Sequence, residues 1–211
     1  MRIETVAYKV YKFNELSEEA KGKVKQWYLD GQESSVYTDM CKEDLKVLFG
    51  NNHDLEVEYS LGYCQGDGFN IYGKINAKDI FNCLEEHNGG TQLEEFENVL
   101  TDKEKRTILC YQDECSDIEL PFNRHYGYCM ADYINIADDW EYDLEVYSEF
   151  RNINVETLKK FEQMVKDIFS TLCKAYEEQG YEFFYEVEEE VLEEHCEVNG
   201  YEFLVDGTLF V

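Results

Sequence analysis

The sequence has little proline, little positive charge and no long apolar run. Its 211 residues include one proline, and no serine- or glycine-rich stretch marks a linker between domains. No apolar run reaches the length of a signal-peptide core or of a membrane-spanning helix. These absences argue against a secreted or membrane-embedded protein. We therefore expect a cytoplasmic protein that folds as a single domain over residues 1–211.

A disulfide framework is also missing, although cysteine is not scarce. The chain is long for a domain held by disulfides, and its cysteines are irregularly spaced. We expect reduced thiols in the core, because unpaired cysteine is among the most buried residue types. The cysteines are Cys41, Cys64, Cys83, Cys110, Cys115, Cys129, Cys173 and Cys196.

The sequence contains none of the short motifs that identify common enzyme classes. A Walker loop, a Rossmann fingerprint, a zincin motif, a nucleophile elbow and an EF-hand loop are all absent. Asp67 lies in a glycine-rich turn, where a carboxylate can bind a cation or act as a base. No His, Ser or second carboxylate stands at a diagnostic spacing from it. We predict a protein that is not an enzyme and holds no cofactor.

A set of four soft ligands leaves a metal site open as an alternative. Zinc accepts thiolate and imidazole ligands, and these four residues fall within twenty positions of one another. Their spacing matches no standard zinc finger, so we predict that no metal is bound. The four residues are Cys110, Cys115, His125 and Cys129.

Alternating apolar and polar residues between Leu55 and Ile75 predict a β-hairpin around which the fold is organised. Asp67-Gly68 in its turn is a strong hairpin signal. Gly73 stands where a large residue is expected, which indicates a close backbone approach or a bulge. Helical spacing of apolar residues elsewhere predicts helices that cover this sheet. The expected fold class is α+β, with an antiparallel sheet of four to six strands flanked by helices.

The other elements follow from periodicity and capping residues. Residues 1–150 should contain the sheet, and residues 151–211 a helical hairpin and a terminal β-hairpin around Asp206-Gly207. Thr101 begins a capping-box pattern, but the apolar run after it fits a strand equally well. We expect helices at about 16–30, 33–49, 76–88, 93–100, 154–180 and 183–199, and strands at about 6–11, 118–120 and 124–136.

Three segments of the chain resemble those of a family of small phage and prophage proteins. They are Phe13–Lys21, the turn Cys64-Gln65-Gly66-Asp67-Gly68, and Asn199–Phe203 followed by Asp206-Gly207. The family usually has serine where this chain has Cys64. The matching residues are turn and cap residues spread along the whole chain. The resemblance therefore implies a mobile-element origin and supports the fold more than any activity.

Negative charge is the strongest signal in the sequence. With 47 acidic and 19 basic residues, the formal net charge is −28. Residues 1–106 have a net charge of −8, residues 107–211 have one of −20, and no Lys or Arg follows Lys174. A field of this sign repels nucleic acid and anionic membranes and attracts basic protein surfaces.

Fifteen acidic residues in three clusters are the predicted partner-binding residues. A surface that serves only solubility normally mixes both signs, so the shortage of cations indicates a use. We expect the third cluster to form a stripe on one helix, opposite Phe184, Val187 and Val191. The clusters are Asp113, Glu114, Asp117 and Glu119; Asp138, Asp139, Glu141, Asp143 and Glu145; and Glu186, Glu189, Glu190, Glu193, Glu194 and Glu197.

The charge pattern predicts an inhibitor that acts by acidic mimicry of nucleic acid, and the resemblance implies that a phage encodes it. Its partner would be a basic host defence protein, such as a CRISPR effector, a restriction enzyme or another nuclease, whose nucleic-acid-binding surface it covers. No direct contact with nucleic acid or membrane is expected. Two alternatives stay open. One is a small metal-binding protein or enzyme that uses Asp67 or the Cys110/Cys115/His125/Cys129 set, and the other is an antitoxin-like partner of a basic toxin.

Overall fold

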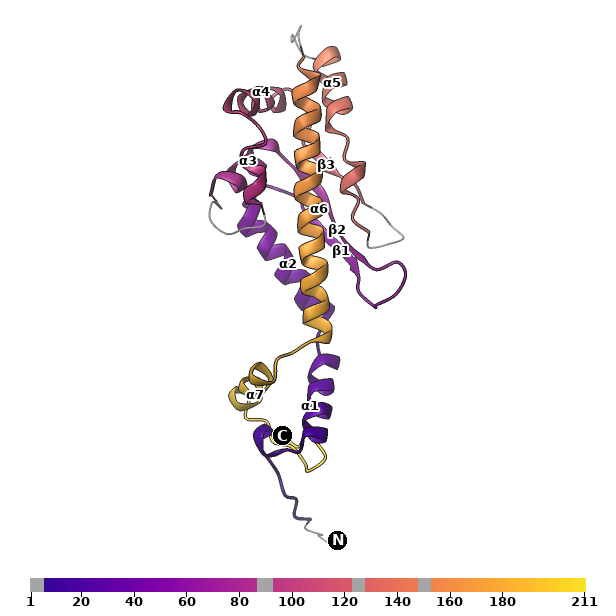
Figure 1. Ribbon diagram of the computed structural model, residues 1–211, viewed down its shortest axis with the longest axis vertical. Helices are drawn as coiled ribbons and strands as arrows, with labels where there is room; N and C mark the ends of the chain where they lie inside the picture. Colours follow the sequence, from indigo (N-terminus) through magenta and orange to yellow (C-terminus); the bar gives the residue numbers. More distant parts are fainter. Residues whose placement is uncertain (1–5, 87–92, 123–127, 148–152) are drawn as a thin grey trace, which may run out of the picture. The chain divides into compact units, whose positions relative to one another are not determined.

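The computed structural model describes residues 6–86, 93–122, 128–147 and 153–211, and it divides the chain into two compact units. Residues 37–179 form the sheet unit, and both chain ends, residues 1–36 and 180–211, form the terminal unit. The sheet-containing part was expected to end near residue 150, whereas the units meet between residues 36 and 37 and between residues 179 and 180. The fold is α+β, with a three-stranded antiparallel sheet flanked by helices, as predicted (Figure 1).

The elements of the described residues are mostly helical. Short 3₁₀ turns occur at Phe13–Glu15, Glu94–Phe96 and Ala131–Tyr133. The strands are β1 (Glu56–Ser60), β2 (Gly68–Ile75) and β3 (Ile118–Leu120). The helices are α1 (Glu18–Asp30), α2 (Ser34–Phe49), α3 (Ala77–Glu86), α4 (Asp102–Gln112), α5 (Ile136–Tyr147), α6 (Val155–Tyr185) and α7 (Glu189–Val198).

Strand β2 is the central strand of the sheet, with the order β1-β2-β3. The predicted hairpin joins β1 to β2, and the pairs Val57–Ile71 and Tyr59–Phe69 lie on its apolar face. Gly73 has a φ of +121°, and a Cβ atom there would lie 2.1 Å from the carbonyl oxygen of Asp54. The close backbone approach expected at this glycine is confirmed.

Helix α6 forms the centre of the core of the sheet unit (Figure 1). The ring of Phe161 lies 5.5 Å from that of Phe81 on α3 and 6.0 Å from that of Trp140 on α5. The ring of Phe169 stacks on that of Phe49 on α2. The helical spacing of apolar residues over 154–180 predicts one inward face. It is confirmed by the burial of Leu158, Phe161, Met164, Val165, Ile168, Phe169, Leu172, Cys173 and Tyr176.

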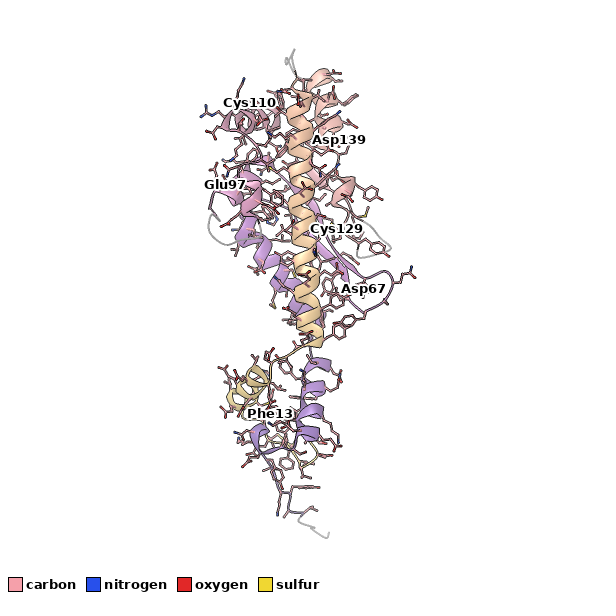
Figure 2. The ribbon with its side chains drawn as sticks, in the orientation of Figure 1. Phe13, Asp67, Glu97, Cys110, Cys129 and Asp139 are labelled. Atoms are coloured by element: carbon pink, nitrogen blue, oxygen red, sulfur yellow. The ribbon has the colours of Figure 1, made fainter. Side chains whose placement is uncertain are left out.

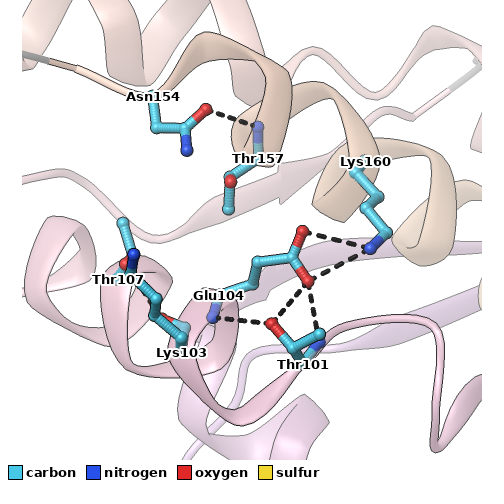
Figure 3. A network of polar contacts seen from close by, with 7 residues as sticks. All are labelled: Thr101, Lys103, Glu104, Thr107, Asn154, Thr157 and Lys160. Carbon is cyan, nitrogen blue, oxygen red and sulfur yellow. Dashed lines mark hydrogen bonds and ion pairs between the residues drawn. The ribbon is translucent and has the colours of Figure 1, made fainter.

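The capping box at Thr101 decides between helix and strand for the segment that follows. Thr101 Oγ1 accepts a hydrogen bond from the Glu104 N–H, and Glu104 Oε2 accepts one from the Thr101 N–H at 2.8 Å (Figure 3). These contacts satisfy backbone donors at the start of α4. Both Glu104 carboxylate oxygens also accept hydrogen bonds from Lys160 on α6 at 3.1 Å. The segment is therefore a helix that is tied to the central helix of the core.

The terminal unit has a small core of its own. Two short backbone bridges, Tyr11 with Phe203 and Phe203 with Leu209, hold the ends of the chain together. Gly207, with a φ of +85°, forms the turn of the predicted C-terminal hairpin against Ala20 of α1. The buried residues of this core are Phe13, Leu16, Ala20, Val24, Leu192, Cys196 and Phe203.

Several predicted elements are wrong. The described part of the expected strand 124–136 contains a 3₁₀ turn and the start of α5, because the Met130 N–H donates to the Asn70 side chain instead of to a strand partner. The segment 93–100 forms only a 3₁₀ turn, and Val6 to Val10 pair with no strand of the described chain. The sheet of the described residues has three strands, fewer than expected.

Helix α6 does not end at Gly180 as expected. It continues to Tyr185, and Gly180 is buried within it, since an isolated glycine costs a helix only about 1 kcal/mol. The chain then leaves the helix, and α7 begins at Glu189. Residues 182–197 are thus divided between two helices and do not form the single acidic stripe that the spacing suggested.

Candidate partner-binding site

An acidic pocket lies between β3 and α5 in the sheet unit. It encloses about 280 Å³ and is lined by side chains from β3, α5 and the segments before them, together with Lys74 of β2. Asp139, labelled in Figure 2, belongs to this pocket. Its acidic residues are Asp117, Glu119, Asp139 and Asp143, and its other residues include Trp140 and Tyr142.

Helix α5 presents two of these carboxylates because its opposite face is buried. Trp140 and Leu144 are 1% and 0% exposed, so they fix the rotation of the helix about its axis. The helix start is held by the Ala137 N–H, which donates to Glu162 of α6 at 2.8 Å. Asp139 and Asp143, one turn apart, are directed away from the core as a result.

Strand β3 forms the other side of the pocket, because its side chains alternate between the core and the surface. Ile118 and Leu120 are buried, so Glu119 between them faces outward. Asp117 immediately precedes the strand and is exposed. Lys74 of β2 pairs with Glu119 in the sheet, so one positively charged side chain lies at the edge of this acidic group.

The pocket carries an excess of negative charge. Four carboxylates share it, and Lys74 is the only Lys or Arg among the described residues that line it. Partial burial raises the pKa of Asp139, and the neighbouring carboxylates of Asp138, Asp143 and Glu119 add to this effect. A cation that enters the pocket would offset the repulsion between the carboxylates, because an opposite charge favours the ionised carboxylate.

The pocket fits an organic cation better than a metal ion. Within the described parts of the chain, no three Asp, Glu, His or Cys side chains converge closely enough to hold a metal. The carboxylates are instead spread around a space of about 280 Å³, slightly below the 300–1,000 Å³ of typical small-molecule sites. That space suits one long side chain, such as arginine or lysine.

The structure thus brings parts of the first two predicted clusters together around one pocket. The remaining members of these clusters lie outside its lining. Asp113 and Glu114 are exposed at the end of α4, Asp138 and Glu145 are exposed on α5, and Glu141 is half-buried.

The third predicted cluster, in the terminal unit, differs from expectation. Glu189 is not free for a partner, because its Oε1 accepts a hydrogen bond from Lys21 Nζ at 2.6 Å. The buried face of α7 is formed by Leu192 and Cys196, whereas Val191 is exposed. Glu186 precedes α7 and is exposed, as are Glu190, Glu194 and Glu197, while Glu193 is half-buried.

The fold also brings two chain ends of different net charge into one unit. Residues 1–36 have six acidic and six basic residues, and residues 180–211 have ten acidic and no basic residues, so the terminal unit has a net charge of −10. The sheet unit has the remaining −18 of the total −28. Lys21 and Lys25 of α1 both contact the segment around α7, at Glu189 and at the Val187 carbonyl. The acidic C-terminal third is therefore partly compensated.

The hairpin turn around Asp67 has the properties of a structural turn. The Asp67 carboxylate accepts hydrogen bonds from the Gly62 N–H at 2.8 Å, from the Cys64 N–H at 3.0 Å and from the Ser60 hydroxyl at 3.2 Å. These donors belong to the turn itself and satisfy most of the carboxylate's lone pairs. Of the three glycines in this turn, only Gly66 has a positive φ. The residue shapes the loop and is not poised as a base.

The proposed zinc ligands do not come together within the described chain. Cys110 is exposed on α4, while Cys129 is half-buried and lies on a different part of the sheet unit (Figure 2). Cys115 is half-buried, and burial raises its pKa to about 12, which opposes the thiolate form that zinc requires. His125 lies outside the described residues.

Among the pocket residues that sequence reasoning missed are Lys74, Trp140 and Tyr142. Lys74 joins the site only through the β2–β3 register, which a strand of three residues does not reveal in the sequence. Trp140 and Tyr142 lie inside the second acidic cluster, so helical spacing from Asp139 and Asp143 is a usable signal. The strand expected immediately before this cluster obscured that signal.

Comparison of the chain with protein-family models, with curated proteins and with solved structures found no match. Across the described residues, none of the helices combines the length and the apolar character needed to cross a membrane.

Proposed function

We propose that this protein is a phage-encoded inhibitor that binds a basic host defence protein and covers its nucleic-acid-binding surface. The observation that carries the proposal is the pocket between β3 and α5. Its lining, as far as the chain is described, holds Asp117, Glu119, Asp139 and Asp143 with Lys74 as the one basic residue. A site of this charge is unsuited to an anionic ligand. Its natural ligand is an arginine or lysine side chain of a protein that normally contacts phosphates.

Binding would combine a buried cation with an aromatic anchor. A guanidinium can form paired hydrogen bonds with a carboxylate, which are stronger than the contacts of an exposed ion pair. Tyr142 lines the pocket and is 60% exposed, and Val146, one turn further along α5, is 52% exposed. Such side chains supply apolar area that a partner can bury, because aromatic residues are enriched among the strongest contacts at interfaces.

The resemblance to small phage proteins directs the proposal to host defence. CRISPR effectors, restriction enzymes and other nucleases expose basic surfaces that bind phosphates, and an acidic protein can compete for those surfaces. Such partners act in the host cytoplasm, so we place the protein there. The electrostatic attraction speeds association and weakens as salt increases.

The test begins with affinity capture from host lysate at low and at high salt, followed by identification of the partner. The captured partner is then assayed for nucleic-acid binding with and without this protein. The pocket variant replaces Asp117, Asp139 and Asp143 with Asn and Glu119 with Gln. If each of the four carboxylates contributes at least as much as an exposed ion pair, about 0.2–1 kcal/mol, affinity should fall by about 4- to 700-fold or more.

A matched control removes the same number of charges from the terminal unit. Glu186, Glu190, Glu194 and Glu197 are exposed, and their replacement by Gln gives the same net charge as the pocket variant. We expect the control to slow association without the full loss of affinity. Equal losses in both variants would show that net charge alone acts, and a partner that keeps its nucleic-acid binding in the complex would contradict the proposed inhibition.

A further inference from the structure

A second pocket, here called the α1–α7 pocket, lies within the terminal unit and encloses about 200 Å³. One wall is a face of α1, and the apolar part of its lining is formed by Phe13, Val187 and Leu192. Phe13, labelled in Figure 2, and Leu192 belong to the buried core of the unit. The apolar part of the pocket is therefore held in place by the packing of the core.

Gly22 leaves this pocket open without serving the fold in any other way. It lies within α1 and its φ is not positive, so the backbone does not require glycine there. A Cβ atom at this position would meet no atom within 4 Å, so no neighbouring group requires the missing side chain either. Glycine within a helix is less stable than alanine. What Gly22 provides is free space in the wall of the pocket.

The charged groups of the α1 face differ from one end of the pocket to the other. Lys21 is already neutralised, because its Nζ donates to Glu189 at 2.6 Å and lies 3.4 Å from the Glu18 carboxylate. Lys25, one turn further along α1, forms no salt bridge within the described chain, and its Nζ donates to the Val187 carbonyl at 2.9 Å.

Lys25 can therefore accept an anion as a further partner. An ammonium group has three N–H donors, and the Val187 carbonyl occupies one of them. Glu18 lies two turns before Lys25 on the same face of α1, so an anion in the pocket is attracted at the Lys25 end and repelled at the Glu18 end. The apolar side chains complete the pocket with a surface that binds no charge.

We propose that the α1–α7 pocket binds a small amphipathic anion, a carboxylate with a short apolar chain. The carboxylate accepts a hydrogen bond from the Lys25 ammonium, and the chain lies over Gly22 against Phe13 and Leu192. The volume of about 200 Å³ is below the 300–1,000 Å³ of typical small-molecule sites, so it suits a short chain and excludes a long lipid. The site is separate from the acidic pocket of the sheet unit and does not depend on the proposed function.

The test uses the full chain, with octanoate as the probe in a calorimetric titration. Acetate has the charged group without the chain, and octanol has the chain without the charge, so both should bind more weakly than octanoate. Lys25→Gln should weaken octanoate binding by about 5-fold, the upper end for one exposed ion pair, and should leave octanol binding unchanged. The matched control is Lys23→Gln, which removes the same charge from an exposed position of α1 outside the pocket and should leave octanoate binding unchanged.

Variants of Gly22 separate loss of the site from loss of the fold. Gly22→Ala and Gly22→Leu introduce better helix formers, so both should raise the urea midpoint of unfolding. The leucine side chain occupies the space over α1, so Gly22→Leu should bind no octanoate, and Gly22→Ala should bind it more weakly than the unmodified protein. Failure of the unmodified protein to bind octanoate, or unchanged octanoate affinity in Gly22→Leu or in Lys25→Gln, would overturn the proposal.

Discussion

Replacing Gly207 with Ala tests the close contact between the C-terminal hairpin and α1 in the terminal unit. A Cβ atom at this position would lie 2.4 Å from the carbonyl oxygen of Ala20, and the backbone has a φ of +85°. The left-handed backbone costs about 1–2 kcal/mol for alanine. Moving α1 or the hairpin to relieve the overlap adds about 1–3 kcal/mol, as overpacking does in cores. The variant should therefore lose about 2–5 kcal/mol.

Variants at two other glycines of the terminal unit separate the cost of the left-handed backbone from the cost of the overlap with Ala20. Gly200 has a φ of +67°, but a methyl group added there would meet no atom within 4 Å, so Gly200→Ala should lose only about 1–2 kcal/mol. Gly22 lies within α1 with free space around it, and Gly22→Ala should gain about 0.5–1 kcal/mol. The three variants differ by one methyl group each and leave the charge unchanged.

Hydrogen exchange read by mass spectrometry is the suitable assay, because peptides from each unit report their own opening free energies. Slower exchange is expected in α1 of Gly22→Ala, and faster exchange in α1 and α7 of Gly207→Ala. Peptides of β2 and α5, in the sheet unit, serve as the internal reference. A Gly207→Ala loss no larger than that of Gly200→Ala would show that the hairpin does not lie against Ala20.

Three further outcomes are expected. Backbone and side-chain hydrogen bonds from Thr101, followed by Lys160, lower the pKa of Glu104 from 4.5 to about 2. Its contribution to stability is therefore complete above pH 4.5 and is lost as the pH falls towards 2, so Glu104→Gln should flatten the stability profile measured by urea unfolding in this range. The protein should give no shift with DNA or RNA in gels without divalent metal at physiological salt, because a net charge of −28 repels polyanions. Reduced protein should unfold in urea at the same midpoint with and without a chelator, and one zinc per chain by elemental analysis would refute this.

Local signals in the sequence predicted most of the helices and the central hairpin. The capping residues Ser17, Asn76 and Asn154 stand at or next to observed helix starts, where their side chains accept hydrogen bonds from backbone N–H groups. The spacing of apolar residues placed the buried face of α6 correctly, and Gly73 marked a real backbone approach. These features depend on a few neighbouring residues, so they are readable without the rest of the chain.

Features that depend on distant residues were not predictable in this way. The segment before α5 has apolar alternation typical of a strand, but Asn70 binds the Met130 N–H from β2 and directs the chain elsewhere. The pocket requires the register of β3 against β2 and the rotation of α5, and neither is fixed locally. The acidic residues were identified from composition, whereas their grouping into one site required the fold.

Both chain ends lie in the terminal unit, and this changes the location that we propose for the partner-binding site. In the sequence, the strongest argument for a binding surface was the absence of bases after Lys174, which pointed to the acidic segment around α7. In the structure, Lys21 of α1 lies against Glu189 and within 3.4 Å of Glu18, and the hydrogen bond with Glu189 is the largest of the effects that raise its pKa. A surface whose charge is partly paired has less to gain from a cationic partner. The described lining of the pocket between β3 and α5 has four carboxylates and one lysine, so the larger gain is available there. For this reason we propose that the partner-binding site lies on the sheet unit.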